Sequence, residues 1–232
     1  MSEHGADEAA HGFRAAGASY NRGMSEPWSP SNALSVRSAE IAAAAAQLVA
    51  EEGLDYTRAK RKAVKALGLN PRAAEMPSNE AVEDEVRAHL ALFQADTQPA
   101  ELAALRGLAL RWMLRLPAFR PHLGGAVWRG TANRHSAIRI DLYCDDPKSA
   151  EIELINLDQR FDAGLLTEER GDDISVLSLS ERCPGLAEPA TLHLIVRDFD
   201  DLRGALKPDA RGRGWRGDAA AIRRLIEAAE AP

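Results

Sequence analysis

The sequence has few of the residues that build disulfide-stabilised or membrane-spanning proteins. Its two cysteines, Cys144 and Cys183, are too few for a disulfide framework, and no Cys/His spacing matches a zinc site. No run of about 18 apolar residues occurs, so no transmembrane helix is predicted. The N-terminus lacks a basic region followed by an apolar stretch, so no secretory signal is expected either. These absences predict a reduced, cytoplasmic protein without a membrane span.

Aromatic residues are also scarce, at 5%, but 45% of the 232 residues are hydrophobic, which is enough to bury a core. The net charge of −6 argues against nonspecific binding of nucleic acid over the whole surface, although a local basic patch is compatible with it. Residues 121–200 contain 8 Lys and Arg against 15 Asp and Glu. This acidity has two interpretations, a solvated acidic face or a divalent-cation site for phosphate chemistry.

The N-terminal half is expected to be helical after a polar segment at its start. Residues 1–34, rich in Ala, Gly, Ser, Glu and His, predict a disordered tail. Gly53 is expected to end a first helix, and Asp55 to begin a second as its N-cap. The apolar spacing predicts four helices in a region spanning 35–119, at residues 36–52, 56–67, 78–95 and 99–116.

Beyond Pro117 the pattern changes to short apolar and β-branched runs. Strands are predicted at 126–128, 137–143, 151–157, 174–180 and 191–197, with the last two forming a hairpin. A final helix is predicted at 218–229. The order predicts an α+β fold, in which the helical N-terminal region precedes a small mixed sheet and a C-terminal helix, with 120–232 as the second domain.

One stretch within this second domain carries candidate chemistry. Gly130-Thr131 forms a predicted turn before the strand that carries Asp141. Small turns let backbone amides approach phosphates, and carboxylates two residues apart on a strand share a face and can share a metal. The positions two and four residues before Asp141 hold Arg139 and Ala137, which are not metal ligands.

Residues 125–157 resemble the nucleotidyltransferase superfamily, which shares the polymerase-β-like palm. Gly130-Thr131 stands where the family has Gly-Ser, and Ser136–Leu142 stands where it has Ser-Asp-Ile-Asp-Leu. The resemblance implies that Mg²⁺ is held by the catalytic carboxylates Asp141, Glu151 and Glu153. It also implies that the nucleotide is contacted by Gly130, Thr131, Arg134 and Ser136.

The chain is also similar to uncharacterised bacterial nucleotidyltransferase-like proteins, on residues 50–63, 110–120 and 130–136. Because Ala137 and Arg139 replace acids, we expect a catalytically impaired relative that binds an NTP with Mg²⁺, or a nucleic acid. If it is active, the reaction is NMP transfer from an NTP to a hydroxyl group. The alternative is a non-enzymatic interaction or RNA-binding module. Asp141 therefore has three interpretations: a metal ligand in a working transferase, a relic in an inactive relative that still binds nucleotide, or an ordinary polar residue on a strand.

Three further features are candidates for phosphate contact. Arg58, Lys62 and Lys65 share one face of the second predicted helix, either for nucleic acid or as a solvated face. Residues 211–217 alternate arginine and glycine around Trp215, which is typical either of RNA-binding segments or of a flexible loop. His135 lies in the Gly-Thr loop, whereas His193 is expected to pack on an apolar strand. The oligomeric state is not predicted.

Overall fold

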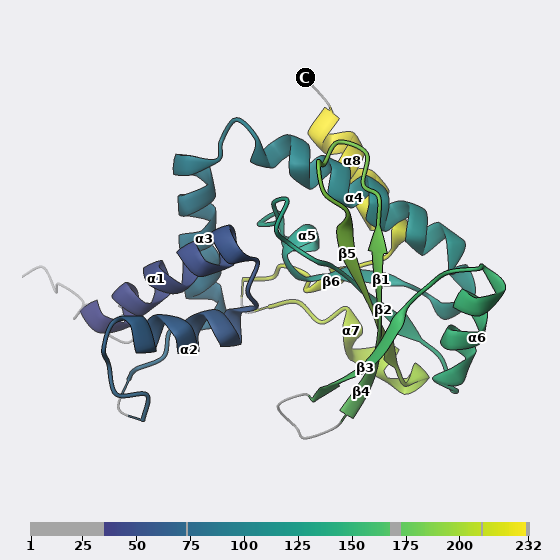
Figure 1. Ribbon diagram of the computed structural model, residues 1–232, viewed down its shortest axis with the longest axis horizontal. Helices are drawn as coiled ribbons and strands as arrows, with labels where there is room; N and C mark the ends of the chain where they lie inside the picture. The colour runs from purple at the N-terminus through teal and green to yellow at the C-terminus, as the bar shows by residue number, and fades with distance from the viewer. Residues whose placement is uncertain (1–34, 73, 168–172, 210, 231–232) are drawn as a thin grey trace, which may run out of the picture. The chain divides into compact units, whose positions relative to one another are not determined.

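The computed structural model describes residues 35–72, 74–167, 173–209 and 211–230 (Figure 1). The predicted disordered tail, 1–34, lies outside the described residues. The four predicted N-terminal helices are present as α1 (Val36–Glu52), α2 (Tyr56–Ala66), α3 (Asn79–Phe93) and α4 (Gln98–Arg115). Side-chain oxygens of Ser35, Asp55 and Ser78 cap the first three helices, and Gly53 ends α1 in the left-handed conformation.

Helices α1, α2 and α3 share a buried cluster of small and branched side chains. Alanines at 42, 45, 46 and 50 give α1 a nearly flat face, against which the neighbouring helices pack closely. The partners are Ala59, Ala63 and Val64 of α2 and Val82, Val86 and Leu90 of α3. The three helices therefore have a hydrophobic cluster of their own.

The C-terminal half forms a six-stranded mixed sheet in the order β3-β4-β5-β2-β1-β6. Strands β2 and β5 are parallel, and the other neighbours are antiparallel. The predicted hairpin of β4 and β5 and the α+β class with a C-terminal helix are confirmed. The bounds are β1 (His122–Gly124), β2 (Ile138–Tyr143), β3 (Asp162–Thr167), β4 (Asp173–Glu181), β5 (Ala190–Arg197), β6 (Arg216–Gly217) and α8 (Ala219–Glu230).

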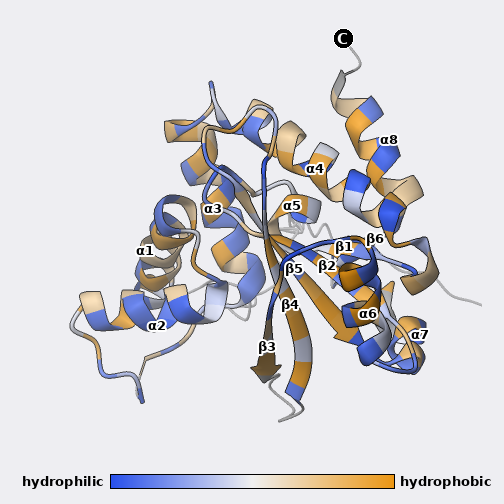
Figure 2. Ribbon diagram, turned by 45° about the vertical axis from the view of Figure 1, so that its right-hand side comes forward, coloured by the Kyte–Doolittle hydropathy of each residue, from blue (hydrophilic) through white to orange (hydrophobic). Residues whose placement is uncertain are grey.

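One face of the sheet is apolar and packs against helices. Ile138, Ile140 and Leu142 alternate along β2 and join Leu105 and Trp112 of α4 in the buried core. Figure 2 shows hydrophobic residues recurring along the strands, and α4 lies beside α8 (Figure 1). Because α4 belongs to this core, the two hydrophobic clusters divide the chain after α3; a domain boundary at 119/120 remains a prediction.

Two predicted strands are helices. Residues 126–128 lie in α5 (Gly125–Arg129), because β1 ends at Gly124 and Gly125, with φ of 65°, turns the chain into a helical turn. Residues 151–157 lie mostly in α6 (Lys148–Asn156). There Ala150 and Leu154 are buried four residues apart while Ile152 is exposed, so the helical period prevails over alternation.

Several short elements were not predicted. They are the edge strands β3 and β6, the 3-10 turns η2 (Pro117–Phe119) and η3 (Phe199–Asp201), and α7 (Leu202–Ala205). In the described part of the chain, every helix is too short or too polar to cross a bilayer.

Candidate ligand site on the polar face of the sheet

The face of the sheet opposite the core carries charged side chains. Along β2, the residues that alternate with the buried Ile138, Ile140 and Leu142 are polar or aromatic. Register places His193 beside Arg139, Arg197 beside Tyr143, and Arg216 in line with Gly124 and Arg139. We call six of these side chains the polar face: Arg139, Asp141, Tyr143, His193, Arg197 and Arg216.

Asp141 lies at the centre of this face, 3% exposed, between two arginines. Its Oδ1 accepts a hydrogen bond from Nε of Arg197 at 2.7 Å, and its Oδ2 accepts one from Nε of Arg216 at 2.5 Å. Such charge-assisted bonds compensate the loss of hydration of a buried carboxylate. One carboxylate therefore serves two guanidinium groups, and Arg139 adds a third positive charge to the same face.

The turn that borders Asp141 is Gly124-Gly125, which sequence reasoning missed. Gly124 pairs with Arg139 on one side and with Arg216 on the other, so no side chain stands between the two arginines. A Cβ atom at Gly125 would lie 3.3 Å from Cδ of Arg139. The signal in the sequence is the Gly-Gly pair itself, which stands directly before the apolar residues 126–128.

The predicted nucleotide contacts at 130–136 are engaged within the fold. The Arg134 backbone N–H donates to Oε2 of Glu101 at 2.9 Å, and its guanidinium lies 3.2 Å from Oε1 of the same residue. Ser136 Oγ accepts from the Asn133 backbone N–H at 3.1 Å. The Gly130 carbonyl oxygen accepts a hydrogen bond from the side chain of Gln98, and Thr131 is buried. A nucleotide role for these four residues remains a prediction.

Two neighbours of that loop have structural contacts as well. The side chain of Asn133 donates to the carbonyl oxygen of Ala50 at 2.6 Å and to Gln94, which joins the loop to the helices. The His135 backbone N–H donates to Oδ1 of Asn133, and the residue is exposed. The loop is therefore stabilised by contacts with α1 and the end of α3.

The three predicted metal ligands are divided between strand β2, which carries Asp141, and helix α6. Glu151 and Glu153 are on helix α6, where side chains two residues apart point in nearly opposite directions. Glu151 pairs with Lys148 at 3.1 Å. Among the described residues, no group of three or more His, Cys, Asp or Glu side chains is placed to hold a metal. With both oxygens of Asp141 bound by arginines, these residues do not fit the Mg²⁺ that the resemblance implies.

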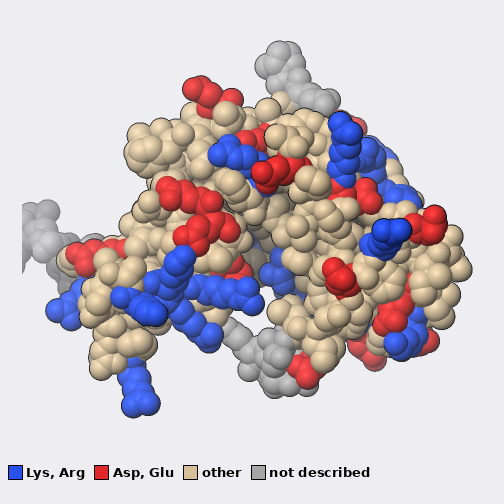
Figure 3. All heavy atoms as spheres, viewed as in Figure 1, with Lys and Arg blue, Asp and Glu red and all other residues tan. Residues whose placement is uncertain are grey.

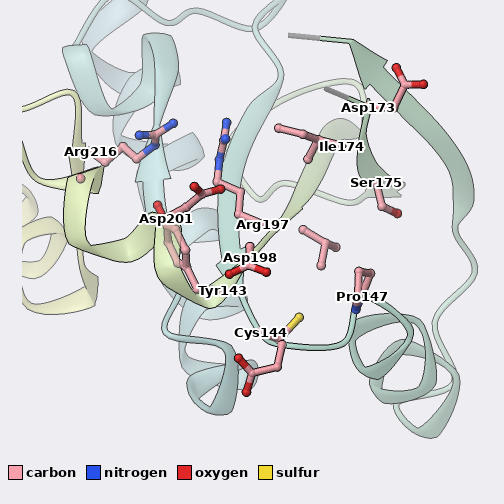
Figure 4. A pocket seen from close by; sticks show the side chains of 13 residues that line it. Tyr143, Cys144, Pro147, Asp173, Ile174, Ser175, Arg197, Asp198, Asp201 and Arg216 are labelled. Carbon is pink, nitrogen blue, oxygen red and sulfur yellow. The ribbon is translucent and has the colours of Figure 1, made fainter. Parts of the chain in front are cut away.

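A cavity of about 610 Å³ opens beside the polar face, near the carboxyl ends of the parallel strands β2 and β5. This volume lies within the range of roughly 300–1,000 Å³ that is usual for small-molecule sites. In Figure 4, Arg216, Arg197, Asp201 and Tyr143 lie on one side of the cavity, with Ile174 across from them. Its walls thus combine cationic, acidic and apolar groups.

Tyr143 brings a buried hydroxyl to this cavity. The residue is 2% exposed, and among the described residues its hydroxyl group has no hydrogen-bond partner. Burial, together with the charge of Asp141, raises the pKa of Tyr143 to about 12, so the hydroxyl stays protonated at neutral pH. A buried polar group without a partner destabilises a fold by about 1–3 kcal/mol, so this hydroxyl lowers the stability of the described fold.

Cys144 also lines the cavity, but its thiol is not in a reactive environment. Burial raises the pKa of the thiol, and the charges of Asp146 and Asp145 act in the same direction. Since the thiolate is the reactive form, Cys144 is not activated as a nucleophile.

The basic stripe of α2 is largely paired with acids. Figure 3 shows Lys and Arg side chains over the part of the surface where α2 lies. Arg58 lies 3.4 Å from Asp55, and Lys62 lies 2.5 Å from Glu52, so only Lys65 of the three predicted contacts is without an ion pair in the described chain. This pairing favours the solvated-face interpretation.

Residues 211–217 are held in place by specific contacts. Arg211 pairs with Asp84 at 2.7 Å, and Arg213 pairs with Asp209 at 3.1 Å. The ring of Trp215 lies under the guanidinium of Arg129, 4.8 Å from it. A Cβ atom at Gly217 would lie 2.2 Å from the ring of Trp128, so only glycine fits there. The segment therefore positions Arg216 against Asp141.

Comparison with known proteins gives partial structural likenesses. No family model matches the chain, and no curated protein matches it. The Cid1 poly(U) polymerase with MgGTP bound is 14% identical over 41% of this chain and 32% of its own, with a TM-score of 0.31. Cid1 in complex with the UTP analogue UMPNPP is 14% identical over 50% and 36%, with a TM-score of 0.32.

A cytoplasmic RNA terminal U-transferase is 19% identical over 42% of this chain and 30% of its own, with a TM-score of 0.29. The chain thus spans about a third of the length of these solved structures. At these scores the likeness does not decide a family or an activity, which have to be argued from the residues of this chain.

Proposed function

We propose that this protein binds a nucleotide in the cavity beside Asp141 without Mg²⁺, and that it does not catalyse nucleotidyl transfer. The observation that carries the proposal is the pairing of both Asp141 oxygens with Arg197 and Arg216. A divalent cation would have to displace the buried guanidinium group of Arg197 and the partly buried one of Arg216, and approach a third positive charge on Arg139. A phosphate group, in contrast, is attracted by the same three arginines.

The walls of the cavity support a nucleotide in particular. Guanidinium groups recognise phosphate oxygens with paired hydrogen bonds, and Arg216 engages Asp141 through Nε, while its terminal nitrogens have no hydrogen-bond partner among the described residues. Ile174 offers an apolar surface to a base. The carboxylate of Asp201 offers hydrogen bonds to a sugar or to base edges.

Calorimetric titration with ATP, GTP, CTP and UTP tests this proposal, each in EDTA and again in Mg²⁺. We expect at least one nucleotide to bind in EDTA, and Mg²⁺ not to strengthen the binding. Arg216→Gln is expected to weaken the affinity by about tenfold, since a hydrogen bond to a charged group contributes roughly 1.5–3 kcal/mol. Arg223→Gln, an exposed change on α8, is the matched control and should bind as wild type does.

Two outcomes would contradict the proposal. Binding that occurs only with Mg²⁺ would return Asp141, Glu151 and Glu153 to a metal-dependent role, and incorporation of labelled NMP into an RNA primer would do so directly. Equal affinities of wild type and Arg216→Gln would place the nucleotide elsewhere on the protein.

A further inference from the structure

A row of paired residues crosses the polar face four positions before Tyr143 and Arg197, and its last member, Arg216, also lines the cavity. Strand register aligns Ser178 of β4, His193 of β5 and Arg139 of β2, followed by Gly124 of β1 and Arg216 of β6. Paired residues of neighbouring strands project from the same face, so these groups share one side of the sheet. Gly124 adds no side chain to the row, which leaves space between the two arginines.

Arg139 and His193 both present hydrogen-bond donors in this row. Arg139 is exposed, and the described residues offer its guanidinium no ion pair or hydrogen bond. Ser178 Oγ and Nδ1 of His193 are 2.9 Å apart. Burial and the nearby Arg139 lower the pKa of His193, so the ring is neutral at pH 7. In the tautomer in which the serine hydroxyl donates to Nδ1, the proton of the neutral ring is on Nε2 and can be donated to an acceptor.

We infer that Arg139 and His193 bind the terminal phosphate of a nucleoside triphosphate whose sugar and base occupy the cavity. This inference rests on the proposed nucleotide site and specifies its ligand. From His193 to Arg197, four residues along β5 span about 13 Å at roughly 3.3 Å per residue. This separation is of the order of the extended sugar and triphosphate of one nucleotide, and Arg216 reaches the interval from the neighbouring strands.

The charge distribution explains how a triphosphate is held without a metal. In metal-dependent sites a divalent cation neutralises the β- and γ-phosphates. Here the fixed charge of Arg139 occupies the open end of the face, while Arg216 and Arg197 lie toward the cavity. A monophosphate reaches only the cavity end, so the number of phosphates should determine the affinity.

The test is a comparison of nucleoside tri-, di- and monophosphates by calorimetry in EDTA, with wild type, Arg139→Gln and His193→Gln. We expect wild type to bind the triphosphate on the order of tenfold more tightly than the diphosphate, given the strength of charge-assisted hydrogen bonds. Arg139→Gln should remove this preference and leave the affinity for the monophosphate unchanged. Arg139 is exposed, so this variant should fold, and its melting temperature checks that it does.

The possible failures are distinguishable. Equal affinities of wild type for tri- and diphosphate would overturn the inference while the nucleotide site stands. The same holds if Arg139→Gln weakens all three ligands by one common factor, because the arginine would then act on the whole face. If wild type binds none of the nucleotides, the proposed function fails together with the inference.

Discussion

This protein contains two clusters of ion pairs that are built from the same residue types but have different surroundings. In the first, Glu83 of α3 and Asp209 bind Arg129 at 2.8 and 3.0 Å, and the three nitrogens of Arg129 all have acceptors. In the second, Asp141 binds Arg197 and Arg216 beside a cavity. The first cluster joins elements, and the three nitrogens of Arg129 all bond within it, whereas Arg197 and Arg216 of the second cluster line a cavity.

Burial of an ion pair therefore does not by itself indicate a ligand-binding site. What separates the clusters is the surroundings of the charged groups. The Asp141 cluster adjoins the Tyr143 hydroxyl, which lacks a partner within the described chain, and a cavity of about 610 Å³. Substitutions in the two clusters should therefore differ in their effects on stability and on the response to a ligand.

The largest effect is expected from Glu83→Gln. Glu83 is 1% exposed and also pairs with Arg87 at 2.8 Å and Arg213 at 3.3 Å. Removing its charge leaves Arg129 buried with one acid fewer, which should lower the free energy of unfolding by about 3–5 kcal/mol in urea denaturation. Asp84→Asn is the control, since the exposed pair of Asp84 with Arg211 should contribute less than about 1 kcal/mol. Equal losses in both variants would refute the structural role of the Glu83 cluster.

Asp141→Asn should be destabilising too, by about 2–4 kcal/mol, because two neighbouring guanidinium groups lose their shared counter-charge. The two variants, Asp141→Asn and Glu83→Gln, should differ in how far a phosphate anion restores their stability. Inorganic phosphate should raise the melting temperature of Asp141→Asn more than that of Glu83→Gln, since only the Asp141 cluster is reachable from the cavity. Equal rescue of the two variants, measured by thermal denaturation at matched ionic strength, would remove the contrast between the clusters.

Acid should weaken the first cluster through Asp209. Burial raises the pKa of this carboxyl, but hydrogen bonds from the Arg213 backbone and the Arg129 side chain outweigh burial and lower it from 3.8 to about 2. A pKa lowered in the folded state stabilises the protein above pH 4, and this stabilisation is lost as the pH falls toward 2. Unfolding in urea between pH 5 and pH 2 should therefore depend less on pH in Asp209→Asn than in wild type. An unchanged slope would contradict the assignment.

The smallest effect is expected at the surface pairs of α2. Changing Arg58, Lys62 and Lys65 together to Gln should alter the free energy of unfolding by about 0.5 kcal/mol or less and leave nucleotide affinity unchanged, since exposed ion pairs contribute little. Filter binding of a single-stranded RNA at two salt concentrations examines the alternative function. RNA affinity that falls with salt and is lost in the triple variant would favour an RNA-binding module instead.

The helices were predictable from the sequence because their signals are local. Ser35, Asp55 and Ser78 are cap residues within three positions of the amides that they accept from, and Gly53 ends α1 by its own backbone preference. The strand prediction for 151–157 was wrong because a short apolar run fits either period, and only packing shows that Leu154 is buried and Ile152 exposed.

The sequence by itself determined the α+β order of elements and placed Asp141 on a strand, because periodicity and caps are properties of neighbouring residues. It also showed that Arg139, which is not a metal ligand, stands two positions before Asp141. Which groups Asp141 contacts could be seen only in the folded chain, since Arg197 and Arg216 lie 56 and 75 positions away and reach it through sheet register. The pairing of β5, β2, β1 and β6 brings Arg197 and Arg216 to Asp141, the residue that was predicted to be a metal ligand.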